Sequence, residues 1–148
     1  MRCEQWVPAP LEDVFRFFSN PANLELVTPP WVGFKILTPL PIEMKVGAQI
    51  EYAIRVHGLP LRWRSEITEW DPPSHFTDVQ LRGPYSQWTH RHSFAEQEGG
   101  TLVVDHLRYA VPLSWVPGEW IIERFVVRPE LERIFKHRQS VLFREFGG

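Results

Sequence analysis

The residues with the greatest chemical potential lie on one stretch of alternating sequence, SQWTHRHSF from Ser86 to Phe94. Side chains alternate here with a period of two, which predicts a β-strand with two distinct faces. One face carries the aromatic side chains of Trp88, His90, His92 and Phe94. The other face carries Gln87, Thr89, Arg91 and Ser93. Because this second set suits solvent, we expect both imidazoles to face the interior.

Partners for these imidazoles lie on the next predicted strand. The turn-like segment Glu96–Gly100 predicts a hairpin. Counting back from this turn places Asp105 opposite the His90–His92 stretch, and Tyr109 shares the face of Asp105. A carboxylate is therefore expected next to the two histidines.

Three more polar residues complete the expected inner group. Asp78 and Gln80 share one face of the preceding predicted strand with Phe76, and Arg138 lies on the apolar stripe of the C-terminal helix. The whole group comprises His90, His92, Asp105, Asp78, Gln80, Tyr109 and Arg138. Isolated buried charges are costly, so we expect these groups to pair with one another or to contact water.

Three interpretations of this polar group remain open at the level of sequence. It could be a structural network that fixes the sheet register and the position of the helix. It could orient a ligand that is held mainly by apolar walls. It could also be catalytic, with His90 or His92 as a general base oriented by Asp105, and with Tyr109 or Arg138 polarising a carbonyl. No catalytic residue is assigned beyond the candidates His90, His92 and Asp105.

A metal site is a weaker hypothesis for the same residues. His90 and His92 place two imidazoles on one strand face, and Asp105 is a third candidate ligand. The sequence offers no evident fourth ligand, and the charge of Arg138 would oppose a bound cation. We therefore expect neither a metal nor a cofactor.

The elements that must position these residues follow from changes in hydrophobic period. Residues 2–7 predict a strand, residues 11–18 a helix, and residues 22–27 a second short helix that Thr28-Pro29-Pro30 ends. Between Gly33 and Tyr109 the period is two, with turn-like breaks that separate six strands. Helical periodicity returns near Trp120, and Pro129 suits the first turn of the final helix.

This order of elements predicts one α+β domain over residues 1–148. A six- to seven-stranded antiparallel sheet needs cover for its apolar face, and only the C-terminal helix is long enough to provide it. A helix that crosses a strongly curved sheet leaves space between them. The expected walls of this cavity are Tyr52, Trp63, Phe76, Trp88 and Phe135. We expect Trp31 and the segment 112–120 to flank its mouth and to gate it.

Composition restricts the partners. Aromatic residues make up 14% of the chain, which suits the walls of a pocket, and the net charge of −2 argues against nucleic acid. With Cys3 as the single cysteine and no signal-like or membrane-spanning stretch, we expect a cytoplasmic protein without stable membrane insertion. A monomer or a weak homodimer is expected.

Several short motifs, in this order and at this spacing, resemble the START/SRPBCC superfamily, and in particular its small bacterial ligand-binding branch. They are Pro8-Ala-Pro10 with Val14-Phe15, Asn23-Leu24 with Thr28-Pro29-Pro30, Phe76-x-Asp78-x-Gln80 with Gly83-Pro84, Trp88-x-His90-x-His92-x-Phe94, Asp105-x-x-x-Tyr109 and Leu131-x-x-Ile134-Phe135-x-x-Arg138. The resemblance implies a helix-grip fold and a cavity for a hydrophobic ligand. It implies no particular reaction, because the superfamily includes polyketide cyclases as well as lipid-transfer domains.

Three functions therefore remain. The leading hypothesis is a binding protein, rather than an enzyme, for a small hydrophobic or amphipathic ligand such as a lipid, an isoprenoid or a polyketide-like molecule. The first alternative is a cyclase or dehydratase that uses the His and Asp residues of the cavity for acid–base chemistry. The second is a protein-interaction module, which would have a filled interior and a large exposed apolar patch.

Overall fold

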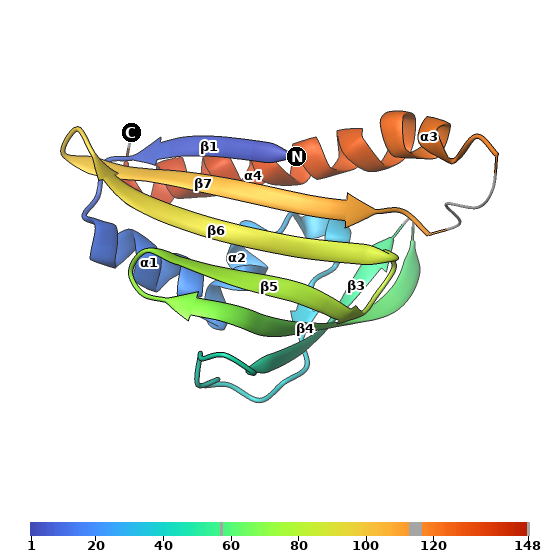
Figure 1. Ribbon diagram of the computed structural model, residues 1–148, viewed down its shortest axis with the longest axis horizontal. Helices are drawn as coiled ribbons and strands as arrows, with labels where there is room; N and C mark the ends of the chain where they lie inside the picture. The colour runs from blue at the N-terminus through green and yellow to red at the C-terminus, as the bar shows by residue number, and fades with distance from the viewer. Residues whose placement is uncertain (57, 113–116, 148) are drawn as a thin grey trace.

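Seven strands form one antiparallel sheet in the order β1-β7-β6-β5-β4-β3-β2 within the described part of the chain (Figure 1). The strands are β1 (Arg2–Val7), β2 (Lys35–Ile36), β3 (Gln49–Val56), β4 (Leu59–Asp71), β5 (His75–Arg82), β6 (Gln87–Gln97) and β7 (Gly100–Ala110). The computed structural model describes residues 1–56, 58–112 and 117–147. The expected meander is confirmed, and β1 joins it by pairing with β7.

Helices lie in two groups along the chain. Between β1 and β2 are α1 (Leu11–Ser19), η1 (Pro21–Asn23), α2 (Leu24–Val27) and η2 (Pro30–Val32). After β7 come α3 (Glu119–Ile122), the π-helical turn η3 (Glu123–Val127) and α4 (Arg128–Phe146). The two short helices after the first strand and the long C-terminal helix are confirmed, and the fold is the helix-grip fold. No helix among the described residues combines the length and the apolar character that crossing a membrane requires.

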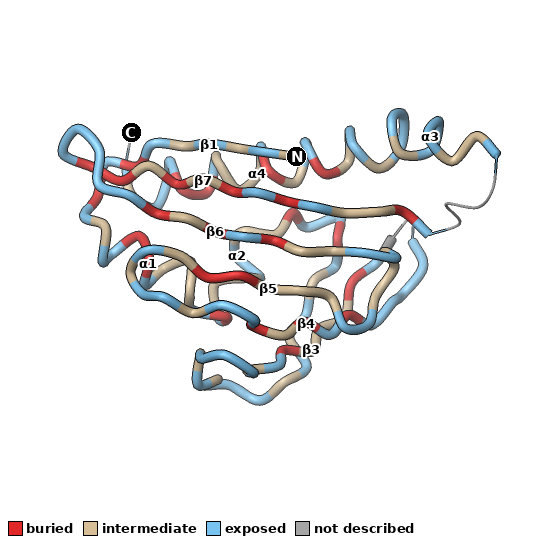
Figure 2. The backbone as a smooth tube through the Cα atoms, in the orientation of Figure 1, coloured by how far each residue is buried: buried red, intermediate tan, exposed pale blue. Residues whose placement is uncertain are grey.

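The turn between β6 and β7 sets the register of the site. Gln97 pairs with Gly100, so that Glu98 and Gly99 form a two-residue loop. Both loop residues have positive φ, 49° and 76°, which is the requirement of a type I′ turn. This register places His92 directly opposite Asp105, as the sequence predicts. Buried and exposed positions alternate along both strands (Figure 2).

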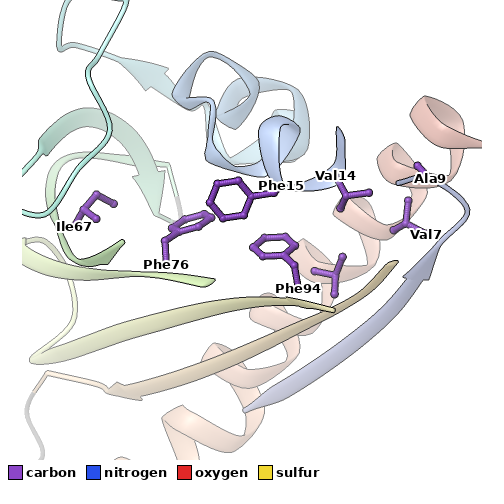
Figure 3. Close-up of a cluster of buried hydrophobic side chains, with 8 residues drawn as sticks. Val7, Ala9, Val14, Phe15, Ile67, Phe76 and Phe94 are labelled. Atoms are coloured by element: carbon purple, nitrogen blue, oxygen red, sulfur yellow. The ribbon is translucent and has the colours of Figure 1, made fainter. Parts of the chain in front are cut away.

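A packed aromatic core fills one end of the space beneath the sheet. Phe15 of α1 packs against the sheet, with ring centroids 5.3 Å from Phe94 and 5.9 Å from Phe76, both edge to face (Figure 3). Aliphatic side chains such as Val14 and Val103 complete this cluster. The edge-to-face geometry adds a specific interaction to the burial of large apolar surfaces. This end of the molecule is therefore closed.

The helix α4 runs alongside β1 and β7 (Figure 1). Its Leu131 and Phe135 are buried and pack with Leu107 of β7. Leu142 is buried further along the same helix. This stripe fixes the rotation of α4 and directs Arg138, which lies between Phe135 and Leu142, toward the sheet.

Candidate functional site

A cavity of about 480 Å³ lies between the sheet, α4 and the helical segment that follows β1. Its walls are mainly aromatic: the Trp63 and Trp88 rings meet edge to face at 4.9 Å, and Tyr52 stacks on Trp63 at 5.8 Å. These rings share one face because Tyr52 pairs with Trp63 across β3 and β4, and period-two alternation keeps inward side chains together. Ile134 and Phe135 contribute the wall from α4.

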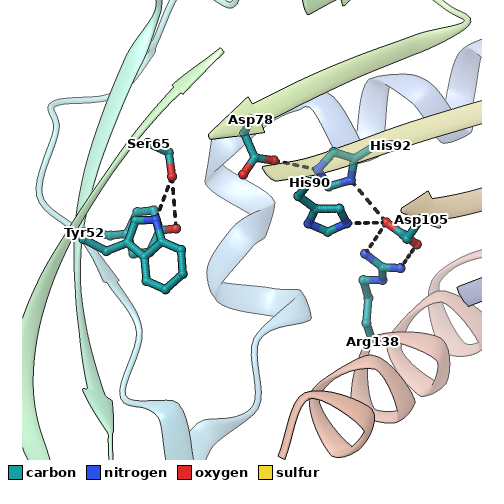
Figure 4. A network of polar contacts seen from close by, with 8 residues as sticks. Tyr52, Ser65, Asp78, His90, His92, Asp105 and Arg138 are labelled. Atoms are coloured by element: carbon teal, nitrogen blue, oxygen red, sulfur yellow. Dashed lines mark hydrogen bonds and ion pairs between the residues drawn. The ribbon is translucent and has the colours of Figure 1, made fainter. Parts of the chain in front are cut away.

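The polar end of this cavity is built around Asp105, which is only 2% exposed. His90 Nε2 lies 2.8 Å from Asp105 Oδ1. Arg138 binds the same carboxylate with both terminal nitrogens, and Nη1 lies 3.2 Å from Oδ1 (Figure 4). His92 Nδ1 lies 3.4 Å from Oδ1, within ion-pair distance. Asp105 therefore joins β6, β7 and α4 in one charged contact.

A second carboxylate holds the other side of His92. Its Nε2 lies 2.7 Å from Asp78 Oδ2. The His92 ring also stacks between two neighbours, with centroids 3.8 Å from His90 and 4.3 Å from Phe76. Both imidazoles are thus fixed in position and orientation by contacts on several sides.

Burial and charge act in opposite directions on these groups. Burial tends to raise the pKa of Asp105, but Arg138 and the two histidines outweigh it and hold that pKa well below its ordinary value. Burial also tends to raise the pKa of Asp78. The hydrogen bond from His92 outweighs burial, so the pKa of Asp78 is lowered as well. Both carboxylates are therefore ionised at neutral pH.

The pKa values of the two histidines shift in opposite directions. Burial and the nearby charge of His92 lower the pKa of His90. Burial also disfavours a charged His92, but its contacts with Asp105 and Asp78 outweigh burial and raise its pKa. The two rings therefore differ in their readiness to hold a proton although they are stacked. His90 is neutral, and its Nε2 donates to Asp105.

Most of the expected site residues line the cavity. They are Tyr52, Trp63, Phe76, Asp78, Trp88, His90, His92, Phe135 and Arg138. Asp105 lies behind this lining and acts on the cavity through His90 and Arg138.

Gln80 and Tyr109 lie away from the polar end. Gln80 closes the loop between β5 and β6, because its Nε2 donates to Tyr85 O at 2.7 Å and its Oε1 accepts from Tyr85 N at 3.1 Å. Tyr109 donates to Glu123 Oε1 at 2.7 Å, and Arg128 Nε donates to the same oxygen at 3.0 Å. Tyr109 pairs with Trp88, several residues along the hairpin from His92.

Ser65 and Tyr85 also line the cavity, and neither belongs to the expected group. Ser65 accepts a hydrogen bond from Trp63 Nε1 at 2.9 Å and lies 3.3 Å from the hydroxyl of Tyr52. It shares the inward face with Trp63, so alternation alone would have identified it. Tyr85 packs against Trp88 at 4.7 Å from a loop, where no periodic signal marks a side chain as inward.

Among the described residues, those that could hold a metal are Asp78, His90 and His92, whose ligand atoms lie within 4.8 Å of one another. The facing nitrogens are already engaged, His92 Nε2 by Asp78 and His90 Nε2 by Asp105. A cation would have to displace a proton from His92 and tolerate Arg138 nearby. The side chains of Asp78, His90 and His92 are therefore poorly suited to coordinate a metal ion.

The gating segment is described only in part, because residues 113–116 lie outside the described residues. Trp31 is half exposed, and Arg133 of α4 lies over its ring at 4.9 Å. Pro112 and the neighbouring Val111 line the cavity, as do Ile122 and Val126. Gating itself stays a prediction.

The fold and the cavity between the sheet and α4 define a helix-grip protein, and comparison with known sequences gives its family. The chain belongs to the polyketide cyclase / dehydrase and lipid transport family, whose profile matches residues 7–134. No curated protein matches the chain in sequence.

Solved structures confirm the fold. TTHA0849 from Thermus thermophilus is 19% identical, with a TM-score of 0.72 over 98% of this chain and 97% of that protein. Ms6760 from Mycobacterium smegmatis is also 19% identical, with a TM-score of 0.69 over 97% of this chain and 90% of its own. The di-domain ARO/CYC protein StfQ from the steffimycin biosynthetic pathway is 12% identical, with a TM-score of 0.67 over 100% of this chain and 52% of StfQ.

Proposed function

We propose that this protein binds a small, largely apolar ligand in the cavity between the sheet and α4. The observation that carries the proposal is the cavity itself, about 480 Å³ in volume, with aromatic walls and one compact polar end. Ligand sites in proteins have this size and this division between apolar surface and a few polar groups. Family membership supports the same class of ligand.

The cavity also favours this function over a protein-interaction module. Such a module would gain stability from a filled interior, because open space forfeits packing contacts. Here the space remains open beside Trp63, Trp88 and Tyr85, three large rings that line it. A cavity retained beside such residues is consistent with selection for an occupant.

Titration with Nile red, an uncharged fluorescent dye, tests the proposal. Ile134→Trp enlarges a side chain that lines the cavity, whereas Ile121→Trp makes the same change on the exposed face of α3, outside the lining. We expect saturable binding to the unmodified protein and to Ile121→Trp. We expect at least about tenfold weaker binding to Ile134→Trp, because the new ring occupies ligand volume.

Equal binding to all three proteins would place the dye on the surface and would contradict the proposal. Absence of saturable binding to the unmodified protein would contradict it as well. Circular dichroism of each variant shows whether the fold is retained.

A second candidate is a cyclase or dehydratase, which the pairing of His90 with His92 favours. A neutral imidazole and a readily protonated one lie 3.8 Å apart beside the cavity, and groups with opposed pKa shifts suit base and acid roles. The test is incubation with a ligand released from the protein, followed by mass spectrometry. Loss of water or a changed retention time that disappears in His90→Phe and His92→Phe would support catalysis, and an unchanged ligand would exclude it.

A further inference from the structure

The hydrogen-bond donors at the polar end are already committed to carboxylates. His90 Nε2 donates to Asp105 at 2.8 Å, and His92 Nε2 donates to Asp78 at 2.7 Å. Both terminal nitrogens of Arg138 donate hydrogen bonds to the Asp105 carboxylate. Two more nitrogens, His92 Nδ1 and Arg138 Nε, have no hydrogen-bond partner among the described residues, but both atoms are buried, and His92 Nδ1 lies 3.4 Å from Asp105 Oδ1. A ligand therefore meets few available donors here.

Acceptors, in contrast, remain available. Asp78 uses Oδ2 for His92, and its side chain, which lines the cavity, is 21% exposed. No described residue is hydrogen-bonded to its Oδ1. Because His90 is neutral and donates through Nε2, its Nδ1 carries a lone pair. Figure 4 shows Nδ1 on the side of the His90 ring that faces away from Asp105, in the direction of Tyr52 and Ser65.

The two carboxylates of the polar end have basic partners without a ligand. Asp78 and Asp105 are the two anions, and the basic groups that contact them are Arg138 and His92, whose pKa is raised by these contacts. An anionic ligand group at this end would lie beside two carboxylates whose cations are already paired. Burying an unpaired charge in such surroundings is costly.

We propose that the polar end recognises an uncharged hydrogen-bond donor, a hydroxyl group on an otherwise apolar and preferably aromatic ligand. This inference rests on the proposed function of the cavity. The hydroxyl donates to Asp78 Oδ1 or His90 Nδ1, while the aromatic body lies among Trp63, Trp88 and Tyr52. Free fatty acids and other carboxylates are disfavoured at this end.

The hydroxyl pair of Tyr52 and Ser65 fits the same class of ligand. Trp63 Nε1 donates to the Ser65 oxygen, so the Ser65 hydroxyl can donate its own hydrogen bond to the Tyr52 oxygen. In that arrangement the hydroxyl of Tyr52 is free to donate to a ligand. A ligand hydroxyl can both donate and accept a hydrogen bond. A carbonyl or an ether can only accept.

Three probes that share one aromatic body test this inference: 2-naphthol, 2-methoxynaphthalene and 2-naphthoate. Each competes with bound Nile red at neutral pH, which gives its dissociation constant. We expect 2-naphthol to bind at least about tenfold more tightly than 2-methoxynaphthalene, because the ether leaves buried acceptors unpaired. We expect 2-naphthoate to bind more weakly than 2-naphthol by a similar factor, since its charge faces Asp78.

The Asp78→Asn variant supplies an independent test by gain of binding. It removes one anion while the charge of Arg138 remains, so the preference for 2-naphthol over 2-naphthoate should fall at least about fivefold. Asp71→Asn is the matched control, because Asp71 is exposed at the end of β4 and outside the lining. It should leave the preference unchanged.

The outcomes distinguish failure of the proposed ligand-binding function from failure of the inferred preference for a hydroxyl group. If Nile red and all three probes fail to bind, both the proposed function and this inference are wrong. If the probes displace Nile red but 2-methoxynaphthalene or 2-naphthoate binds as tightly as 2-naphthol, the cavity still binds ligands and only this inference fails. An unchanged preference in a folded Asp78→Asn variant would also overturn it.

Discussion

Asp105 is the residue on which the polar end depends. It is almost fully buried, and its carboxylate is shared by His90, His92 and Arg138. A buried ion pair contributes little net stability compared with apolar packing, but removing one partner leaves an uncompensated charge. The loss of Arg138 should therefore be far more damaging than the loss of an ordinary surface arginine.

The variant Arg138→Met should be destabilised by about 3 kcal/mol, because it strands the Asp105 charge while keeping an apolar side chain beside Phe18 and Phe135. Urea unfolding measures the difference. Arg144→Met changes an exposed arginine in the last turn of the same helix and should alter stability by less than about 0.5 kcal/mol. Equal effects of the two changes would contradict the role of Arg138.

The same contacts make stability sensitive to acid. The pKa values of Asp105 and Asp78 are lower in the folded protein than in the unfolded chain, so their contribution is complete above about pH 4. It is lost as the pH falls through the folded values. In Arg138→Met the contribution of Asp105 should be smaller, because without the guanidinium the pKa of Asp105 rises toward its value in the unfolded chain.

The two histidines should titrate on opposite sides of their ordinary pKa. His92 should hold its proton to higher pH than a free histidine, and His90 should lose its proton at lower pH. In linkage terms His92 stabilises the fold below its unfolded pKa and loses this effect as the pH rises, whereas protonation of His90 destabilises the fold as the pH falls. Nitrogen-detected NMR of the imidazoles measures both values and their tautomers. A reversed order would contradict the charge assignment.

At the scale of elements, the hairpin of β6 and β7 explains how much of the site the sequence could predict. Period-two alternation identifies the inward face, and a two-residue turn fixes the register, so His90, His92 and Asp105 could be brought together without a structure. The pairing of His92 with Asp78 required a third strand whose register with β6 no tight turn marks.

The period-two alternation of side chains identifies which face of a strand a residue occupies. It does not show which part of the cavity that residue reaches. Tyr109 shares the face of Asp105, yet its hydroxyl reaches Glu123 of η3, beyond the reach of any pattern within the strand. Gln80 shares the face of Asp78, yet it lies next to a loop whose backbone groups need partners, and it satisfies them. Both depend on three-dimensional neighbours that sequence spacing does not reveal.

The start of the C-terminal helical segment is the element best suited to admit a ligand. Trp120 and Phe125 are 61% and 66% exposed, whereas Ile122 and Val126 of the same segment line the cavity. A segment with few buried contacts opens more readily than packed strands. We expect the amides of residues 120–126 to exchange hydrogen faster than those of β6 and β7. Protection equal to that of the central strands would contradict gating by this segment.

The molecule as a whole is divided between a packed end and an open one. Phe15, Phe76 and Phe94 close the space near α1, while the aromatic residues of β3, β4 and β6 surround the cavity at the other end. Composition could predict an aromatic interior, but not which rings pack together and which stand apart. That division depends on the curvature of the sheet and on the position of α4, which are properties of the complete fold.

The most direct test of the ligand-binding function is mass spectrometry of what the purified protein carries. Protein is denatured in organic solvent and the released small molecules are identified, with Ile134→Trp purified in parallel as the control. We predict a reproducible apolar molecule in stoichiometric amount, bearing a hydroxyl group, that is depleted in the variant. Repeated extraction of an empty protein, together with no binding of added Nile red, would contradict the account.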